Sequence, residues 1–118
     1  MATHNTTGQI GEALAANWFI NKGYTILHQN WRYKNLEVDI IASKQQMLHF
    51  IEVKSTTTIQ YGHPENNVSP KKITNLINAS AQYLYLYPQW QRIQFDVLAI
   101  TMLANTEIAY YLIEDVYE

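Results

Sequence analysis

Two strand-like segments joined by a short polar connection constrain this chain more than any other feature. Residues 36–42 alternate between polar and apolar side chains, and residues 47–57 are rich in branched and aromatic side chains. The connection Ser43-Lys44-Gln45-Gln46 is short enough to predict an antiparallel hairpin. Because a hairpin alone is marginally stable in water, the rest of the chain must cover it.

Helical patterns before and after the hairpin predict that cover. A helix is expected over residues 8–22, with Thr6 or Thr7 as its N-cap and Gly23 directly after its end. Ser69 and Pro70 predict the start of a second helix. The expected buried stripes are Ile10, Leu14, Trp18 and Phe19 in the first helix, and Ile73, Leu76, Ile77, Ser80, Ala81 and Leu84 in the second, which Pro88 ends.

Further strands are expected over residues 24–33, 91–102 and 107–113, which gives the order αβββαββ. This order predicts an α/β fold, with a mixed sheet of about five strands flanked by helices. With 118 residues, 47% of them hydrophobic and 15% charged, the chain is expected to form a single globular domain over 1–118. Residues 1–7 are expected to be flexible.

Composition also restricts compartment and partners. There is no cysteine, so neither a disulfide framework nor a Cys-ligated zinc site can form. No apolar run approaches the roughly 18 residues of a membrane span, and the N-terminus does not resemble a signal peptide. We therefore expect a cytoplasmic protein with no membrane partner. The formal net charge of −2 argues against nonspecific coating of nucleic acid, although bound cations would reverse the sign of a local acidic site.

The hairpin carries an unusual concentration of charge. If Ala42 lies opposite Met47, then alternation places Glu37, Asp39 and Ile41 on one face together with Leu48, Phe50, Glu52 and Lys54. Glu37 would then face Glu52, and a shift of two residues would instead bring Asp39 opposite Glu52. A shift of one residue would disperse the cluster. Because facing carboxylates repel, a divalent cation is expected between them, and Mg²⁺ needs only one or two carboxylates plus a substrate phosphate.

Asp39 followed by Glu52-Val53-Lys54 on the next strand resembles the PD-(D/E)xK signature of restriction-endonuclease-like nucleases. A wider set of segments between Gly8 and Ile100 resembles the bacterial YraN-like family. These segments are Gly8-Gln9-Ile10-Gly11-Glu12, Gly23-Tyr24, Asn30-Trp31-Arg32, Glu37-Val38-Asp39-Ile40-Ile41, Phe50-Ile51-Glu52-Val53-Lys54, Lys71 or Lys72, and Phe95-Asp96-Val97.

The resemblance implies a restriction-endonuclease-like core and a nuclease dependent on Mg²⁺ or Mn²⁺. It makes Glu12, Asp39 and Glu52 metal ligands or close neighbours of the metal, with the Val53 carbonyl as a further ligand and Lys54 as the catalytic lysine. The same arrangement is similar to archaeal Holliday-junction resolvases, so branched or damaged DNA is the expected substrate, with DNA favoured over RNA and a homodimer left open. Candidate substrate-binding residues are Arg32, Lys71, Lys72 and Glu37.

Three departures from the family pattern motivate a second hypothesis. Leu36 stands where the family usually has Gly, Thr56 where an Arg is common, and Gln94 where an Arg is usual. The chain therefore fits either an active nuclease or a nucleic-acid-binding or protein-interaction module that retains the site without turnover.

Several other residues allow more than one interpretation. Glu37 either touches a metal, pairs with Arg32 or Lys34, or faces solvent, and Glu12 also suits an early helix position through the helix dipole. Lys71 and Lys72 open a helix, where cations are disfavoured, so they either await a phosphate or lie in solvent. His49 and Asp96 are expected to be structural, and His63 is a weak candidate for substrate contact. Tyr83, Tyr85, Tyr87 and Trp90 form either a base-stacking platform, a helix end or a dimer contact.

Overall fold

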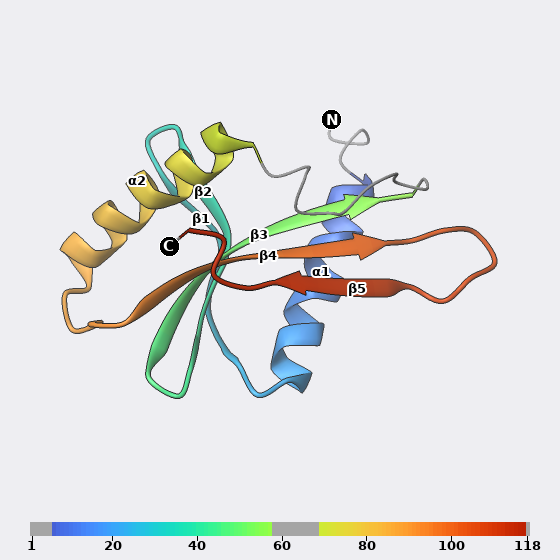
Figure 1. Cartoon of the computed structure of the whole chain (residues 1–118), viewed down its shortest axis with the longest axis horizontal. Coiled ribbons are helices and arrows are strands. Elements are labelled where there is room, and N and C mark those ends of the chain that lie inside the picture. The colour runs from blue at the N-terminus through green and yellow to red at the C-terminus, as the bar shows by residue number, and fades with distance from the viewer. Residues whose placement is uncertain (1–5, 58–68, 118) are drawn as a thin grey trace.

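The computed structural model describes residues 6–57 and 69–117, and its elements follow the expected order (Figure 1). Helix α1 spans Thr6–Asn21 and helix α2 spans Pro70–Leu86. The strands are β1 (Thr25–Tyr33), β2 (Leu36–Lys44), β3 (Met47–Thr56), β4 (Ile93–Thr101) and β5 (Ala109–Ile113). Neither helix in this described part of the chain is long and apolar enough to cross a bilayer.

The five strands form one mixed sheet in the order β1-β2-β3-β4-β5. Strands β1, β2 and β3 pair as antiparallel neighbours, β3 and β4 are parallel, and β5 returns antiparallel to β4. The parallel pair is the one connected through α2, as a crossover requires. The predicted α/β class and the order αβββαββ are confirmed, and the arrangement is that of a restriction-endonuclease-like core.

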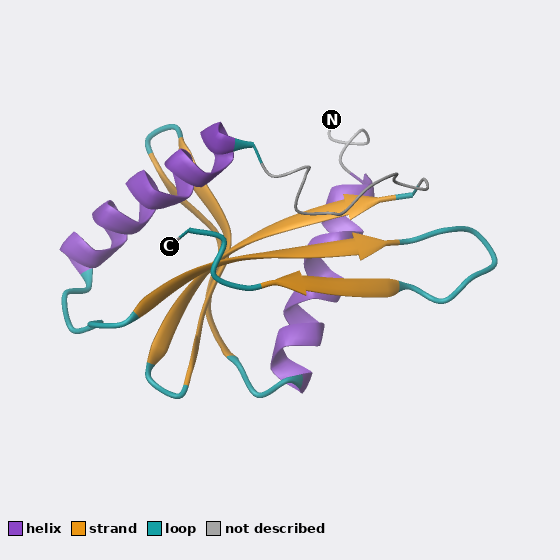
Figure 2. Ribbon diagram, viewed as in Figure 1, coloured by secondary structure: helices purple, strands orange, loops and turns teal. Residues whose placement is uncertain are grey.

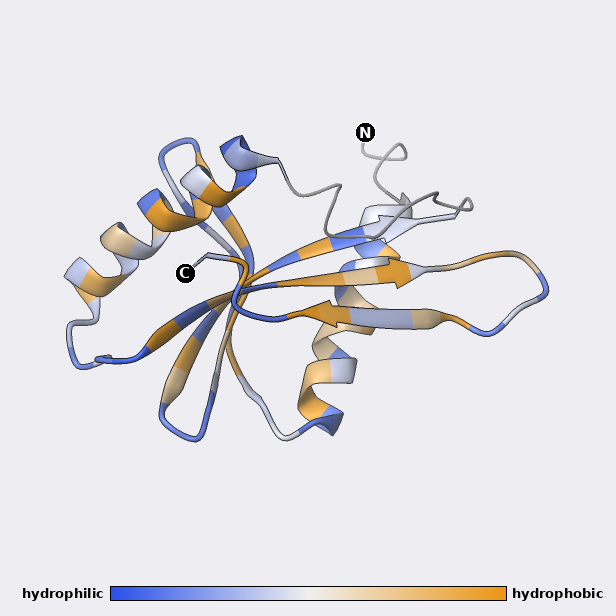
Figure 3. Cartoon of the chain, in the orientation of Figure 1, coloured by the Kyte–Doolittle hydropathy of each residue, from blue (hydrophilic) through white to orange (hydrophobic). Residues whose placement is uncertain are grey.

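The two helices cover opposite faces of the sheet, so the core consists of two layers (Figure 2). Figure 3 shows that apolar residues concentrate in the strands and inner helix faces, whereas the β1–β2 and β2–β3 turns are polar. The α1-side cluster contains Ala15, Ala16, Phe19, Tyr24, Ile40, Ala42, Ile51, Leu98 and Ile100. The α2-side cluster contains Val38, Ile41, Leu48, Phe50, Leu76, Ala79, Tyr83 and Phe95.

Helix α1 ends as the sequence predicts but packs through a different stripe. Gly23 has φ of 95°, and the hydrogen bonds from Gly23 N to Ile20 O and from Tyr24 N to Phe19 O form the paired termination that a C′ glycine permits. The expected inward position of Ile10 is wrong, because Ile10 is 50% exposed. Thr6 and Thr7 lie within the helix instead of before it.

Small residues explain this packing of α1. An added Cβ at Gly11 would clash with the Ser55 side chain on β3, with only 2.8 Å to the Ser55 Cβ. The helix therefore approaches the sheet through Gly11, Ala15 and Ala16, and the larger Phe19 fills the space further along.

Helix α2 begins as predicted, with the Ser69 hydroxyl accepting a hydrogen bond from Lys72 N and Pro70 in the first turn. Its buried residues are Leu76, Ala79, Ser80 and Tyr83, whereas Ala81, expected inside, is exposed. Tyr83 is only 2% exposed, and its ring contacts those of His28, Trp31, Phe50 and Tyr87. Tyr83 is therefore a core residue, which contradicts its place in a base-stacking platform.

The β2–β3 hairpin is shifted by two residues from the assumed register. Lys44 lies opposite Met47, and Ile41 lies opposite Phe50 instead of Leu48. The turn consists of Gln45 and Gln46 alone, with φ of 52° and 67°. Positive φ at both central residues defines a tight two-residue turn whose twist matches that of the strands. The longer four-residue connection was the wrong assumption.

This turn uses residues that do not favour its backbone conformation. Replacing Gln45-Gln46 with Asn-Gly is expected to stabilise the protein by about 1 kcal/mol, because both new residues adopt positive φ at lower cost. Urea denaturation measures the change in the free energy of unfolding. The control replaces Gln29 in β1, an exposed residue whose φ is not positive, with Gly, and should give no gain. Equal stabilisation at both sites would contradict the turn assignment.

Candidate functional site

The candidate site lies where β2 and β3 separate. In Figure 1, the β1–β2 end of the sheet bends toward α2, while β3, β4 and β5 continue across α1. Val38 belongs to the α2-side cluster and Ile40 to the α1-side cluster, although simple alternation would place both on one face. In β1, Asn30 has a φ of 54°. Its neighbours Gln29 and Trp31 pair with Ile40 and Val38, so Asn30 lies at the level of Asp39. Both strands therefore change direction around Asp39.

Asp39 lies in this separation and is anchored by the main chain of β3. Its Oδ2 accepts a hydrogen bond of 2.7 Å from Val53 N, beyond the last β2–β3 pair of Ile40 and Ile51. The carboxylate thus takes the place of a main-chain acceptor that the diverging strand no longer provides. One oxygen is fixed, and no hydrogen bond within the described residues engages the other, Oδ1.

The surroundings of Asp39 strongly disfavour its ionised form. The pKa of Asp39 is raised from 3.8 to about 7. Burial is the largest cause of this rise, and the negative charge of Glu52 is the next largest. The hydrogen bond from Val53 lowers the pKa, while the charges of Glu12 and Glu37 raise it. Carboxylates from α1, β2 and β3 are thus electrostatically coupled around the partly buried carboxylate of Asp39.

A polar pocket of about 430 Å³ opens beside Asp39. It is lined by the start of α1 and by the bent part of β1 and β2, through Gly8, Gln9, Glu12, Asn30, Arg32, Glu37 and Asp39. The expectation that all the charged residues share a face with Ile41, Leu48 and Phe50 is only partly correct. Glu52 and Lys54 lie on the α2 side with those three residues, whereas Glu37 and Asp39 line a pocket with the start of α1. The change of direction at Asp39 broke the alternation on which that expectation rested.

Glu52 approaches the separation from β3 and is paired with α2. Its Oε2 lies 3.1 Å from Lys72 Nζ, with the Glu52 side chain 20% exposed. This ion pair explains how a lysine is tolerated in the first turn of α2, because the charge of Lys72 is balanced by Glu52 of the same chain. Lys71 is exposed.

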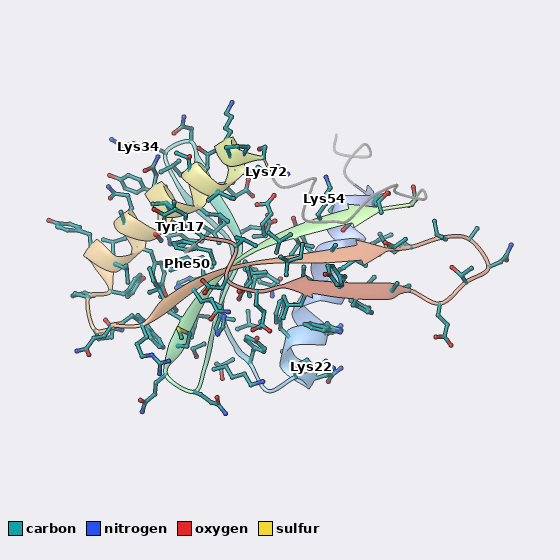
Figure 4. All side chains as sticks on the ribbon, viewed as in Figure 1. Lys22, Lys34, Phe50, Lys54, Lys72 and Tyr117 are labelled. Atoms are coloured by element: carbon teal, nitrogen blue, oxygen red, sulfur yellow. The ribbon has the colours of Figure 1, made fainter. Side chains whose placement is uncertain are left out.

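Lys54 lies two residues beyond Glu52 and is partly buried. Figure 4 shows Lys54 rising from β3 and Lys72 from the first turn of α2. Val53 between Glu52 and Lys54 packs in the α1-side cluster, so both charged side chains point to the other face of the strand. No ion pair within the described residues holds Lys54.

Glu37 pairs with Arg32, which was one of the alternatives expected for it. Its Oε1 lies 3.5 Å from Arg32 NH2, and the two residues face each other in the β1–β2 register. The Arg32 side chain is 69% exposed, so the pair adds little stability. It does hold a guanidinium at the rim of the pocket that contains Asp39.

The donor set fits a hard divalent cation. Within the described residues, no three His, Cys, Asp or Glu side chains already converge as a ready-made metal site. However, Mg²⁺ and Mn²⁺ take oxygen ligands, and Mg²⁺ commonly keeps several waters. Asp39 Oδ1 and the coupled carboxylates of Glu52 and Glu12 supply such ligands, and a cation would relieve the repulsion that raises the pKa of Asp39.

His49 and Asp96 lie apart from this site, as expected for structural residues. His49 Nδ1 and Asp96 Oδ2 are 2.6 Å apart, and both side chains are buried. Asp96 Oδ1 accepts hydrogen bonds from Gln94 Nε2 and Asp115 N. His63 lies outside the described residues.

Sequence reasoning missed two contributors to the site. Asn30 was noted only within the Asn30-Trp31-Arg32 segment, yet its positive φ bends β1 beside Asp39. An Asn in the middle of a strand-like run was the available signal, since Asn tolerates this conformation better than most residues. The pairing of Lys72 with Glu52 had no sequence signal, because it depends on how α2 lies across the sheet.

The fold and this site together define a restriction-endonuclease-like α/β protein. The chain belongs to the YraN-like family described as "Uncharacterised protein family UPF0102", whose family model matches residues 11–100. It is similar to a UPF0102 protein of Flavobacterium johnsoniae, with 42% identity over 104 residues and 85% of each chain covered. A UPF0102 protein of Phocaeicola vulgatus is 38% identical over 100 residues, covering 85% of this chain and 83% of that one.

A third relative, the UPF0102 protein of Prosthecochloris aestuarii, is 42% identical over 94 residues, covering 79% of this chain and 74% of the relative. The predicted family is therefore confirmed. The matched residues 11–100 include Glu12, Asp39, Glu52 and Lys54. The names of these relatives give the family alone, so an activity has to be argued from the site.

Proposed function

We propose that the protein is a Mg²⁺- or Mn²⁺-dependent phosphodiesterase that acts on DNA. The observation that carries this proposal is the position of Asp39, held by Val53 N in the separated sheet and coupled to the carboxylates of Glu52, Glu12 and Glu37. A partly buried carboxylate with so many acidic neighbours is costly for a fold, and such groups concentrate at functional sites. Branched or damaged DNA is the proposed substrate class, in line with the resolvase-like arrangement of the same residues.

Asp39 and Glu52 would hold the metal, with Glu12 and the Val53 carbonyl as nearby or additional ligands. Bound there, the metal would polarise a scissile phosphate and lower the pKa of an attacking water. The hydrogen bond from Val53 N to Oδ2 already fixes the orientation of the Asp39 carboxylate. Binding of a metal to Oδ1 would therefore cost little additional side-chain entropy. The Glu52 carboxylate is oriented by Lys72 in a similar way.

Lys54 would position the attacking water or stabilise charge that develops on the phosphate. It suits either role because it lies next to Glu52 on the same face of β3 and carries no ion-pair partner within the described residues. Arg32 at the pocket rim, Lys71 and Lys72 would contact the substrate backbone. Lys72 would do so if metal binding draws Glu52 away from it, and Glu37 would keep Arg32 in place.

The test is cleavage of a panel of linear, flapped and four-way DNA in Mg²⁺ and in Mn²⁺. Lys54→Gln and Glu52→Gln are expected to lower cleavage by at least about 100-fold, as for removal of one electrostatic catalytic group. Lys22→Gln and Glu107→Gln remove the same charges at exposed positions, with Lys22 far from Lys54 and Lys72 (Figure 4), and should cleave like wild type. Circular dichroism confirms that each variant is folded. Undiminished cleavage by Lys54→Gln would overturn the role of Lys54.

A second candidate function is a DNA- or protein-binding module that retains the site without turnover. The specific observation that favours it is the Glu52–Lys72 ion pair, which already neutralises one proposed metal ligand. Such a module should bind its partner equally well in chelator and in Mg²⁺, whereas the enzyme should need the metal for productive binding. The cytoplasmic location remains a prediction, and a homodimer, which the sequence leaves open, is tested by sedimentation of the purified protein.

A further inference from the structure

A second polar pocket lies at the opposite end of the sheet from Asp39. It has a volume of about 260 Å³ and is bounded by the β2–β3 turn, the start of β4 and the segment after β5. Its lining includes Tyr24, Lys44, His49, Arg92, Gln94 and Glu114. Figure 4 places Lys22, which lines an adjoining pocket, near the same lower end, far from Lys54 and Lys72. This pocket has no part in the function proposed above.

His49 is held in one orientation beside this pocket. Its Nδ1–H donates to Asp96 Oδ2, and Asp96 is itself fixed by Gln94 Nε2 and Asp115 N. The other ring nitrogen, Nε2, has no hydrogen-bond partner within the described residues. No enclosed side-chain nitrogen or oxygen among those residues lacks a partner, so Nε2 retains some exposure to solvent, and His49 is among the residues that line the pocket. A buried histidine is thus oriented with one free nitrogen toward solvent.

Two cations beside His49 have no acidic partner. Lys44 Nζ donates to Lys22 O at 2.8 Å and lies 4.9 Å from the centre of the Tyr24 ring. Arg92 is held by its main chain, whose carbonyl accepts a 2.9 Å hydrogen bond from Leu48 N. Within the described part of the chain, neither Lys44 nor Arg92 forms an ion pair. Their charges are therefore available to a ligand.

The balance of charge at this end favours an anion. Of the residues that line the pocket, Lys44 and Arg92 are positively charged and Glu114 is negatively charged, in a chain whose net charge is −2. Asp96 is turned away from a ligand, because its oxygens are occupied by three donors. Gln94 Nε2 lies 3.4 Å from Glu114 Oε1 and holds that carboxylate at the side. The pocket therefore presents donors from several directions.

We propose that this pocket binds the phosphate group of a phosphomonoester, with His49 Nε2, Lys44 and Arg92 as its donors. A tetrahedral phosphate offers several acceptor oxygens, which suits a guanidinium, an ammonium and an imidazole placed on different sides. The volume of about 260 Å³ exceeds that of a phosphate group, so the pocket also has room for atoms attached to the phosphate. A larger ligand can extend from it into a neighbouring space.

The neighbouring space suits a nucleoside. A third pocket, of about 470 Å³, shares Arg92 with the phosphate pocket. Its other lining residues are Ser43, Gln46, Gln89, Trp90 and Gln91. An indole ring can stack on a base, and uncharged amides can donate to and accept from a base edge. The ligand class is therefore a nucleotide with a terminal phosphate, either free or at the 5′ end of a strand.

Calorimetric titration in chelator tests this proposal separately from any metal-dependent activity. The probes are inorganic phosphate, a 5′-mononucleotide, the matching nucleoside, and one oligonucleotide with and without a 5′ phosphate. We expect binding of the phosphorylated probes and at least about tenfold weaker binding without the phosphate. A tighter complex with the mononucleotide identifies a free ligand, and a tighter complex with the phosphorylated strand identifies a strand end.

Variants then locate the binding. Arg92→Gln and Lys44→Gln lie at the surface and should fold normally, with phosphate affinity lowered by about tenfold each. Lys34→Gln and Asp39→Asn are the controls, and both should bind as wild type does. The ¹⁵N resonance of His49 Nε2 should shift on adding phosphate. Unchanged binding by Arg92→Gln and Lys44→Gln, or equal binding of the nucleoside, would overturn the proposal, whatever the outcome of the cleavage assay.

Discussion

Replacing Asp39 with asparagine is expected to stabilise the protein at neutral and alkaline pH while it abolishes DNA cleavage. The carboxyl of Asp39 has a pKa of about 7 in the fold, against 3.8 when unperturbed, because of burial and the nearby charge of Glu52. Between these values the folded state binds a proton that the unfolded chain has released. The free energy of unfolding of the wild type therefore falls as pH rises from about 4 to about 7.

Asparagine removes this cost and keeps an oxygen for the hydrogen bond from Val53 N. The gain from Asp39→Asn should be absent below about pH 4 and complete above about pH 7, with an upper limit of about 4 kcal/mol from the difference between the two pKa values. Urea denaturation in chelator at pH 4 and pH 8 measures it. Glu107→Gln, at an exposed carboxylate, should show no such pH-dependent gain. A destabilised Asp39→Asn at pH 8 would contradict the proposed electrostatic cost.

The same variant also tests the metal. Mg²⁺ binding to the wild type should recover the stability that ionised Asp39 costs, by about 2.7 kcal/mol at a concentration of 100 times the dissociation constant. Asp39→Asn should gain much less from Mg²⁺, because it offers an amide oxygen in place of a carboxylate. Fold stability and function are thus opposed at this one side chain, as is common where an active site conflicts with the fold.

The sequence was sufficient to predict the elements and their order because the signals were local. Ser69 with Pro70, Gly23 and the alternating runs each act within a few residues, and all appear in the structure close to their expected positions. The hairpin register was off by two residues because Gln45-Gln46 lacks the Asn or Gly that usually marks a two-residue turn. Since the shift was an even number, the residues that share each face of β3 were still predicted correctly.

The geometry of the candidate site could be predicted only in part, because it depends on a departure from regular strand structure. Alternation placed Glu52 and Lys54 on one face, and this agrees with the packing of Val53. Alternation failed at Asp39, where β1 and β2 change direction together. The contribution of Lys72 depends on the position of α2 across the sheet, and no pattern within one element reports such a distance.

Asp96 provides the contrast with Asp39, since both are acidic residues within family-like segments and both are withdrawn from solvent. Asp96 has three donors arranged around its carboxylate, from His49, Gln94 and the main chain of Asp115. Asp39 has one such donor and acidic neighbours. The number of donors therefore separates a carboxylate that supports the fold from one that the fold tolerates for another purpose.

Asp96→Ala is consequently expected to destabilise the protein by about 3 to 5 kcal/mol, because it leaves buried donors without an acceptor. Asp96→Asn keeps an oxygen for Gln94 and Asp115 N, so its cost should be clearly smaller. Glu107→Ala controls for loss of an exposed carboxylate. Thermal unfolding should show a fall in Tm of at least about 12 °C for Asp96→Ala, at roughly 4 °C or more for each kcal/mol. If Asp96→Ala were as stable as wild type, Asp96 would not support the fold, and its place beside His49 would need a functional explanation.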